Sequence, residues 1–464
     1  MAEGERDAIP VAAFADVPAF VRGLAFADLP VDVVTSARRS LLDLIGIAAA
    51  GSRTRAAAIG NHYAATQMCG SDCNARMLFD GRRAGVAGAA FAGATTIDAV
   101  DGHDGHVLTK GHAGAAIFPA LLALVDAAAP GQLPPPMDGS EFLALLVLGY
   151  EVATRAGIAL HATVPDYHCS GAWNALGCAA IAARRLAFDA ETTRHALGVA
   201  EYFGPRGQIL RACDSPTMVK DGSGWGAHVG LTAALLARDG FTGAPALTIE
   251  RDDAVALWRD LGERWRIREQ YFKAYPVCRW AQPAIEAALA LQRADGFPAD
   301  DVATIAVESF REAVALGSSC ARPRTTEEAQ YSITFPVAAA LVFGHLGADE
   351  VGSTGLGDTR VEDLAAKVTL AEDEAFSRRF PAERWARVRI TLVDGRSFAS
   401  EPARARGNPE NPLSDDELRA KYRELASPVL GAGRAARIER AVDALATEGD
   451  ALPSLLADLL SPPG

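Results

Sequence analysis

Ionisable side chains are concentrated in one short stretch of the chain. It holds, in order, Asp98, Asp101, His103, Asp104, His106, Lys110 and His112. The residues on both sides are mostly small and apolar, as in packed helices. Buried charges must be paired or hydrogen-bonded, and they concentrate at functional sites. This stretch is therefore the first candidate for a functional site.

The stretch allows two kinds of chemistry. A carboxylate can tune a neighbouring imidazole to a near-neutral pKa, so aspartate and histidine together can act as general acid and base. The same side chains could instead bind a divalent metal, with His103, His106 and His112 as ligands. Their spacing matches no strong metal motif such as His-Glu-x-x-His. A structural role for the charges is the third alternative.

Two further stretches place a charged or ionisable side chain at the start of an expected helix. His168 precedes one helix, where packing on Trp173 is an equally good explanation. Lys220 precedes a glycine-rich helix start, and helix amides together with a lysine suit a carboxylate or phosphate. The chain has neither Gly-x-x-x-x-Gly-Lys-Ser/Thr nor Gly-x-Gly-x-x-Gly there, which argues against a nucleotide site.

The last candidates lie in the second half of the chain. Lys273 stands among aromatic residues where the sequence changes character, so it could reach an interdomain cleft, although a surface lysine is the alternative. Cys278 could be a nucleophile, but no Cys-His-Asn signature supports that. Tyr331 lies in the segment 327–336 and has the weakest support from chemistry alone.

The elements that must position these residues are mostly helices. Apolar residues recur at helical spacing over 31–50, and Gly51 follows as a stop. Further helices are expected over 54–68, 83–98, 113–128, from Asp138 onward, 171–187, 190–202 with Asp189 as N-cap, and 223–238. A loop is expected at 131–136. Alanine and glycine dominate these helices, which predicts a tightly packed bundle.

Strand-like alternation appears only in the second half, over 302–308 and 388–393, the latter followed by an Asp394-Gly395 turn and residues 397–399. Helices are expected over 281–293 and 332–345. We predict a mainly α fold: a helical bundle domain from residues 1–268, an inserted α+β lid domain from 269–404, and C-terminal helices over 405–464 that rejoin the bundle.

Bulk properties narrow the class of protein. The 464 residues carry a net charge of −13, which argues against nucleic acid or an anionic membrane as partner. The seven cysteines are scattered, and no second pair stands at zinc-ribbon spacing. The acidic N-terminus is unlike a secretory signal, and no uninterrupted apolar run suits a membrane span. A cytoplasmic protein with reduced thiols is the expectation.

Several of these stretches together resemble the MmgE/PrpD family, and the likeness is collinear over nearly the whole chain. They are the acidic-histidine stretch running into His112-Ala-Gly-Ala-Ala-Ile-Phe-Pro, Gly149-Tyr-Glu-Val-Ala-Thr-Arg, the His168 helix start, the Lys220 segment, Lys273-Ala-Tyr-Pro-Val-Cys-Arg, Gln330-Tyr-Ser and Arg406-Gly-Asn-Pro-Glu-Asn-Pro. The resemblance is specific for the family and much less so for the reaction, because members include 2-methylcitrate dehydratase, cis-aconitate decarboxylase and iminodisuccinate epimerase.

The resemblance implies an all-helical domain built from both chain ends, an α+β lid, homodimers, and activity without a metal or an organic cofactor. Position by position, it implies site roles for Asp98, Asp101, His112, His168, Lys220 and Lys273. The chain departs from the family in two places. The segment between Asp101 and His112 is longer than usual, and Phe335 is expected where the decarboxylase has a site tyrosine.

Acid/base chemistry next to a carboxylate needs a base, an acid and cations that stabilise developing negative charge. We assign proton transfer to Asp98, Asp101, His112 and His168, and substrate binding to Lys220, Lys273, His103 and Tyr331. The hypothesis is a cofactor-independent lyase, of the dehydratase type, acting on a small di- or tricarboxylic acid. An epimerase, a decarboxylase and a non-catalytic acid-binding protein are the alternatives.

Overall fold

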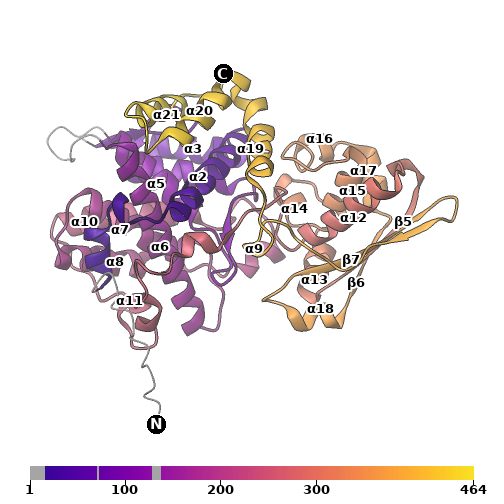
Figure 1. Cartoon of the computed structure of the whole chain (residues 1–464), viewed down its shortest axis with the longest axis horizontal. Coiled ribbons are helices and arrows are strands. Elements are labelled where there is room, and N and C mark those ends of the chain that lie inside the picture. The colour runs from indigo at the N-terminus through magenta and orange to yellow at the C-terminus, as the bar shows by residue number, and fades with distance from the viewer. Residues whose placement is uncertain (1–15, 71–72, 128–136) are drawn as a thin grey trace, which may run out of the picture.

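The computed structural model describes residues 16–70, 73–127 and 137–464. The described chain forms a large helical domain and a smaller domain built around a sheet, which lie side by side in Figure 1. The fold is mainly α, as predicted. The expected loop at 131–136 lies outside the described residues.

The helical domain is built from helices of both chain ends. From the N-terminal part come α1 (Val17–Gly23), α2 (Val31–Gly51), α3 (Arg55–Gln67), α4 (Val86–Asp98), α5 (Gly114–Asp126), α6 (Gly139–Thr163), α7 (Gly171–Arg185), α8 (Ala190–Phe203), α9 (Leu210–Asp214), α10 (Ser223–Arg238) and α11 (Leu247–Glu250). The predicted caps are present: Asp138 accepts a hydrogen bond from the Glu141 amide, and Asp189 from the Thr192 amide, both at 2.8 Å.

Small residues let these helices pack closely. A Cβ at Gly230 of α10 would lie 2.4 Å from the Ala175 carbonyl of α7, and one at Gly149 of α6 would lie 2.3 Å from Ile117 of α5. Helix α6 is long and apolar enough to cross a membrane, but its apolar window is wholly buried inside the domain. It is the central helix of a packed core, as its composition predicts.

The C-terminal helices α19 (Asp415–Leu430), α20 (Ala432–Ala444) and α21 (Ala451–Leu459) cover the top of the helical domain in Figure 1. Helix α19 packs along α2. Its start carries a capping box, in which Ser414 and Glu417 satisfy each other's backbone amides. The buried Lys421 of α19 donates to Asp43 of α2 at 2.6 Å. The C-terminal segment thus returns to the N-terminal bundle.

The smaller domain has a five-stranded sheet in the order β6-β5-β7-β8, with β9 also paired to β7. Its strands are β5 (Val302–Ser309), β6 (Val368–Glu372), β7 (Trp385–Leu392), β8 (Ser397–Ala399) and β9 (Ala403–Arg404). Strands β5 and β7 alternate buried and less buried residues, as predicted, and pair antiparallel. Strand β6 pairs parallel to β5 and was not predicted, because after Val368 it is largely exposed and lacks apolar alternation.

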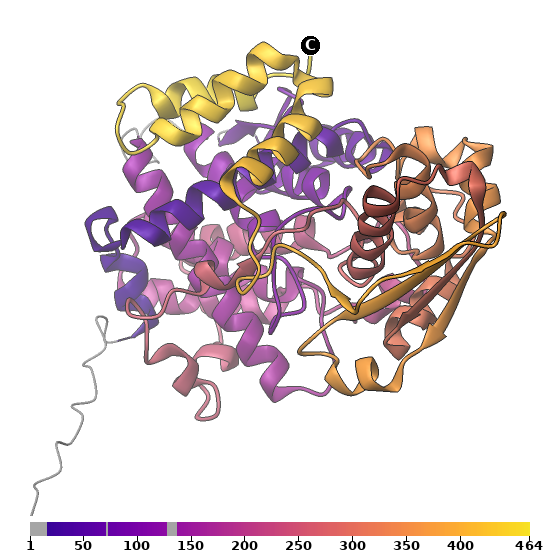
Figure 2. The ribbon, with the colours of Figure 1, turned by 45° about the vertical axis from the view of Figure 1, so that its right-hand side comes forward.

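Helices lie over this sheet in Figure 2. They are α12 (Gln282–Asp295), α13 (Arg311–Ser319), α14 (Thr326–Gln330), α15 (Thr334–Phe343), α16 (Ser353–Leu356), α17 (Thr359–Ala365) and α18 (Glu374–Arg379). We call this domain the lid. Its apolar core contains Ile305, Val307, Phe335 and Val388 and is separate from the core of the helical domain.

Two small ladders complete the fold. Strands β1 (Asn74–Arg76) and β2 (Arg83–Gly85) pair beside α4. Strand β3 (Gly105–His106) pairs antiparallel with β4 (Gln270–Tyr271). The second ladder matters for function, because β3 lies inside the acidic-histidine stretch and β4 lies where the chain passes from the helical domain to the lid.

Candidate active site

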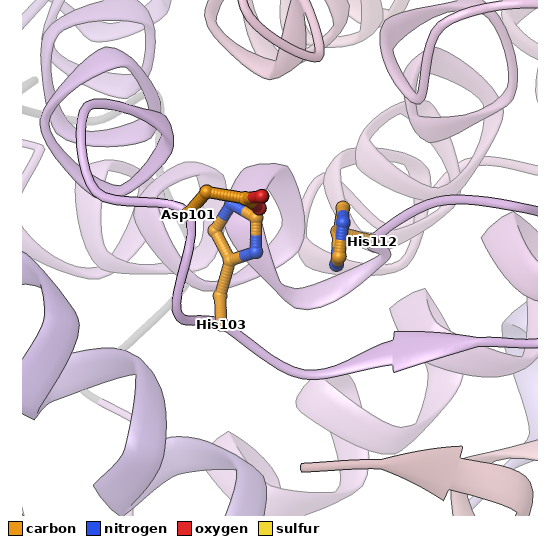
Figure 3. A group of neighbouring side chains, drawn as sticks. All are labelled: Asp101, His103 and His112. Atoms are coloured by element: carbon orange, nitrogen blue, oxygen red, sulfur yellow. The ribbon is translucent and has the colours of Figure 1, made fainter. Parts of the chain in front are cut away.

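The acidic-histidine stretch forms a loop between α4 and α5, and side chains from it converge on one place. Figure 3 shows Asp101 and His103 together near the end of α4, with His112 opposite them. The ring centroids of His103 and His112 are 4.1 Å apart. All three side chains are buried. The loop thus concentrates ionisable groups at a site shielded from water, where electrostatic interactions are strong.

Asp98, the last residue of α4, faces the start of α10. Its Oδ2 accepts a hydrogen bond from the Ser223 amide at 2.9 Å, and its Oδ1 lies 3.4 Å from Nε2 of His103. Burial raises the pKa of Asp98 to about 7, outweighing the helix-start amide, which favours the charged form. Asp98 can therefore hold a proton near neutral pH and release it, as a general acid must.

His112 is oriented as a base. Its Nδ1 contacts the Asp104 backbone carbonyl, which can only accept, so Nδ1 carries the proton and Nε2 the lone pair. Nε2 lies 4.0 Å from Oδ2 of Asp221. Burial, together with the positive charge of its neighbours, lowers the pKa of His112 to about 3. The imidazole is consequently neutral and able to accept a proton at physiological pH.

His103 lies between the acid and the base. It is fully buried, and neither ring nitrogen has a hydrogen-bond partner among the residues the structure describes. Burial and the nearby Lys273 lower its pKa to about 3. An unpartnered buried imidazole is costly, and its ring nitrogens are therefore available for a further hydrogen bond between Asp98 and His112.

Asp101 and Lys273 form a buried ion pair across the two domains. The Asp101 amide also donates to Oε1 of Gln330, at the end of the lid helix α14, at 2.8 Å. Burial alone would raise the pKa of Asp101, but attraction to Lys273 and other cations holds it well below its usual range. The same attraction raises the pKa of Lys273 against its burial. Both groups are therefore charged.

Lys220 brings a second cation to the same place. Its Nζ donates to Oε1 of Gln330 at 2.6 Å and lies 5.1 Å from the centre of the Tyr331 ring. Burial lowers its pKa. Its φ of 49° is in the left-handed region, where a residue with a Cβ is strained, and such strain is common at functional sites. The lid thus contributes Gln330 and Tyr331 directly to the site.

Seven of the eight predicted site residues meet in this cluster, and His168 makes its hydrogen bonds outside it. The His168 amide donates to Nε2 of His161 at 3.1 Å, and its Nδ1 donates to the Arg206 carbonyl at 3.2 Å. Its chain neighbour Ser170 reaches the cluster instead, accepting from the His112 amide at 3.0 Å and donating to Asp221 at 3.2 Å.

Three other features singled out in the sequence are placed by the structure. Phe335 is buried in the lid core, and Tyr331 is the aromatic residue beside Lys220. At the start of α10, the Ser223 amide donates to Asp98. Burial raises the pKa of the Cys278 thiol to about 12, which agrees with the lack of a nucleophile signature in the sequence.

Sequence reasoning missed several participants. Asp221, Gln330, Ser170 and Tyr271 each contact or face predicted site residues. Asp221 directly follows Lys220, and Gln330 directly precedes Tyr331. This adjacency to predicted residues is the signal that could have found them. Gly105 was also missed, because it has no side chain of its own at the site. A Cβ there would lie 2.6 Å from the Tyr271 hydroxyl and 2.7 Å from Nδ1 of His112.

The same side chains include groups that could ligate a metal ion. Two groups, Asp101–His103–His112 and Asp98–His103–Asp221, each bring three ligand atoms within 4.8 Å of one another. Either group could hold a divalent ion by distance alone. The ammonium group of Lys273 pairs with Asp101, and Lys220 also acts on both Asp101 and Asp98. This local positive charge favours an anionic ligand over a cation.

A helical domain closed by an α+β lid, with an acid, a neutral base and two lysines buried between them, has the make-up of a cleft enzyme acting on anionic substrates. The chain matches the MmgE/PrpD N-terminal domain over residues 15–265 and the MmgE/PrpD C-terminal domain over residues 275–447. It belongs to the MmgE/PrpD family, as its sequence motifs predicted.

Similar curated proteins carry two activities in their names. A cis-aconitate decarboxylase-like protein of Aspergillus oryzae is 27% identical, covering 93% of this chain and 94% of its own. The cis-aconitate decarboxylase of Aspergillus terreus is 25% identical, covering 97% and 96%. The 2-methylcitrate dehydratase of Cupriavidus necator is 27% identical over 35% of this chain and 37% of its own.

Proposed function

We propose that this chain is a lyase that acts on a small di- or tricarboxylic acid, with dehydration as the favoured reaction. The observation that carries the proposal is the buried pairing of an acid with neutral imidazoles. The carboxyl of Asp98, with a pKa of about 7, lies 3.4 Å from His103, whose ring is 4.1 Å from that of His112. Dehydration requires both a proton acceptor and a proton donor, and this site provides both.

The proposed step assigns one role to each group. Nε2 of His112 removes the proton from the carbon next to a carboxylate, and Asp98 gives its proton to the leaving hydroxyl. The carbon–hydrogen electron pair becomes the new carbon–carbon double bond, and the hydroxyl leaves as water. Lys220 and Lys273 bind carboxylates and stabilise the negative charge that develops between proton removal and departure of the hydroxyl.

Substrate binding would replace internal contacts of the lysines. Lys220 is held by Gln330 and Lys273 by Asp101, so both cations already have their positions before a ligand arrives. Such preorganisation lowers the cost of stabilising the transition state. We place the substrate between the helical domain and the lid, where closure would exclude water. The step uses no metal and no organic cofactor.

Decarboxylation is the second candidate, and two observations favour it. The ammonium of Lys220 lies over the ring of Tyr331, so this site contains a tyrosine hydroxyl that could donate a proton. The relatives named for decarboxylation also match nearly the whole chain. A decarboxylase needs an acid to protonate the carbon that carbon dioxide leaves, and Asp98 could serve there too.

The first test is proton NMR in deuterium oxide of the protein with 2-methylcitrate, citrate, cis-aconitate, iminodisuccinate and sugar acids. Loss of water from one acid supports the dehydratase, and loss of carbon dioxide selects the decarboxylase. Deuterium exchange next to a carboxylate without elimination would make the protein an epimerase instead. Ligand-induced stabilisation with no product from any acid would indicate a non-catalytic acid-binding protein.

Variants connect the reaction to the site. His112→Ala and Lys220→Ala should abolish turnover while the fold is retained, because each removes a group that meets the reacting carbon or its carboxylate. The exposed His62 offers a matched control, and His62→Ala should leave the rate unchanged. Full turnover in either site variant would remove that residue from the mechanism.

The rate should also depend on pH in a defined direction. Asp98 acts as an acid only while protonated, so the rate should fall as pH rises through about 7. The neutral state of His112 imposes no loss until the pH approaches about 3. A pH–rate profile measured between pH 5 and 9 checks this, and a rate that rises across this range would contradict the assignment of Asp98.

We further propose that the enzyme works as a cytoplasmic homodimer. The cysteines of the described chain are all free thiols, which suits a reducing compartment. The dimer is proposed from family membership, and light scattering after size exclusion measures it directly. A monomer at micromolar concentration would contradict it.

A further inference from the structure

A cavity outside the proposed active site lies at the boundary between the two domains. Its volume is about 560 Å³, within the range of small-molecule sites. The helical domain contributes the end of α2 and one side of α19, and the lid contributes the start of α14 and the segment leading into α16 (Figure 1). None of the eight predicted site residues, all of which are described, lines it. The cavity is therefore a separate place where one ligand could contact both domains.

A buried carboxylate without a partner forms part of the cavity wall. Glu327, in the first turn of α14, is only 5% exposed and lines the cavity. Its carboxylate makes no hydrogen bond and no ion pair with the residues that the structure describes. The ammonium of Lys220 attracts it from the side of the active site but donates to Gln330, at the other end of α14. Because an unpaired buried charge is costly, Glu327 indicates a cationic ligand.

Two further carboxylates converge on another wall of the cavity. A Cβ at Gly347 would lie 2.6 Å from Oε1 of Glu424 and 2.9 Å from Oε2 of Glu350, so both oxygens border the same glycine. The Gly347 amide donates to Oε2 of Glu350 at 2.9 Å, and Oε1 of Glu350 lies 3.4 Å from Nε2 of His345. Glu424 comes from α19 and Glu350 from the lid. The two domains thus bring negative charge to one place.

The arginines around the cavity do not neutralise these carboxylates. Arg53 is paired with Asp349 at 3.1 Å, and both side chains are about half exposed. Arg55 is also exposed. Among the described lining residues this leaves two carboxylates without an ion pair, Glu327 and Glu424, and one exposed cation, Arg55. The cavity is therefore anionic, most strongly at the buried Glu327.

We propose that this cavity binds a small aliphatic amine, whose positive charge takes the place of the missing partners of Glu327 and Glu424. An ammonium group has three donors and forms strong hydrogen bonds with carboxylates. Val100, Leu356 and Leu425 also line the cavity and suit an apolar body. A bare metal ion fits less well, because in the described chain only the two active-site groups bring three ligand atoms within 4.8 Å. The proposal is independent of the proposed function.

Calorimetric titration of the intact protein with butane-1,4-diamine tests the site, and butane-1,4-diol is the neutral probe of the same length. The diamine should bind with a Kd below about 1 mM, and the diol should not bind measurably. Glu327→Gln should weaken the diamine at least about 10-fold, the loss expected for a charge-assisted hydrogen bond. Glu424→Gln should weaken it less, because Glu424 is exposed. Glu374→Gln, whose side chain is 86% exposed on α18, is the matched control and should change nothing.

Thermal unfolding separates a lost ligand from a lost fold. Glu327→Gln removes an unpaired buried charge, so this variant should unfold at the same temperature as wild type or higher. The diamine should raise the unfolding temperature of wild type but not that of Glu327→Gln. An unaltered diamine affinity in Glu327→Gln overturns the site. So does a wild-type protein that binds the diol or magnesium chloride as tightly as the diamine, or that binds no diamine. A Glu327→Gln variant that unfolds at a lower temperature would show that Glu327 stabilises the fold, which also overturns the argument.

Discussion

The Lys421–Asp43 and Lys273–Asp101 pairs contain the same chemical groups in different surroundings. Lys421 and Asp43 join two helices of the helical domain, α19 and α2, at 2.6 Å. Lys273 and Asp101 join the domain junction to the acidic-histidine loop. Burial raises the pKa of Asp43 despite Lys421, whereas cations hold the pKa of Asp101 well below its usual range.

The difference shows how one kind of ion pair serves two purposes. Around Asp43 the carboxylate is only partly compensated, and its Oδ2 has no hydrogen-bond partner among the described residues. Around Asp101 there are two lysines, and the surplus positive charge can be used by an anionic ligand. Cations act on both carboxylates, but burial outweighs them at Asp43, whereas Lys273 and Lys220 outweigh burial at Asp101. The first pair holds α19 on α2, and the second lies beside a further lysine where an anionic ligand can bind.

The largest expected effect separates the pairs by rate. Lys273→Met should lower kcat/KM by about 10³-fold or more, which is about 4 kcal/mol of transition-state stabilisation. Lys421→Met should change the rate of the folded protein far less, because Lys421 meets no reacting group. Steady-state kinetics on the acid identified by NMR measures both. Equal losses in the two variants would make the two pairs functionally alike.

The next effect is on stability. Lys421→Met leaves Asp43 buried without its partner and should lower the free energy of unfolding by about 3–5 kcal/mol. Urea denaturation measures the change. Replacing both partners, as in Lys421→Met with Asp43→Leu, should recover most of it, because no charge then stays buried. A double variant as unstable as the single one would show that the ion pair itself holds α19 on α2.

A smaller effect is expected at a buried carboxyl whose hydrogen-bond donor is a tyrosine and not a lysine. Asp104 accepts from the Tyr150 hydroxyl at 2.7 Å, and burial raises its pKa to about 7, above the value of 3.8 expected in the unfolded chain. Its contribution to stability is complete below about pH 4 and is lost as pH rises through 7. Asp104→Asn should therefore stabilise the fold by roughly 2–4 kcal/mol at pH 8 and not at pH 4.

Urea denaturation of wild type and Asp104→Asn at the two pH values measures that difference. The asparagine side chain can still accept from Tyr150, so the comparison isolates the charge. A variant that is less stable than wild type at pH 8 would contradict the raised pKa of Asp104.

The smallest effect belongs to an exposed pair between the domains. Arg53, which follows α2, lies 3.1 Å from Asp349 of the lid, and both side chains are about half exposed. Water and salt screen such pairs, so Arg53→Ala should cost less than about 1 kcal/mol. Thermal unfolding at low and high salt measures it. A loss of stability comparable with that of Lys421→Met would mean that exposure to solvent does not determine how much these ion pairs stabilise the fold.

Much of the helical domain could be predicted from the sequence, because its signals are local. Apolar periodicity located α2, and Asp138 and Asp189 were expected to begin helices, where their side chains do accept the capping hydrogen bonds. Strand β6 could not be predicted in this way, because an exposed edge strand has no apolar alternation. Its place depends on pairing with β5, some sixty residues earlier.

The candidate site was predictable as a list of charged residues and only partly as a geometry. Asp101, His103 and His112 share one loop, and Asp98 ends the helix before it, so local sequence brings them together. Gln330 comes from the lid, and although it precedes Tyr331 in the chain, the sequence does not indicate that it contacts Lys220 and the Asp101 amide. The same lack of long-range information gave no reason to separate His168 from the site.

The short ladder between β3 and β4 has a mechanical consequence. Gly105 and His106 are paired with Gln270 and Tyr271, and Nε2 of His106 also donates to Glu269 at 3.0 Å. The loop that carries His112 is therefore hydrogen-bonded to β4, the segment about which the lid would rotate. Any opening that displaces this segment either breaks the ladder or pulls the loop with it. Movement of the lid and movement of the proton-transfer groups are thus coupled. When the cleft is open, these groups are also out of position for catalysis.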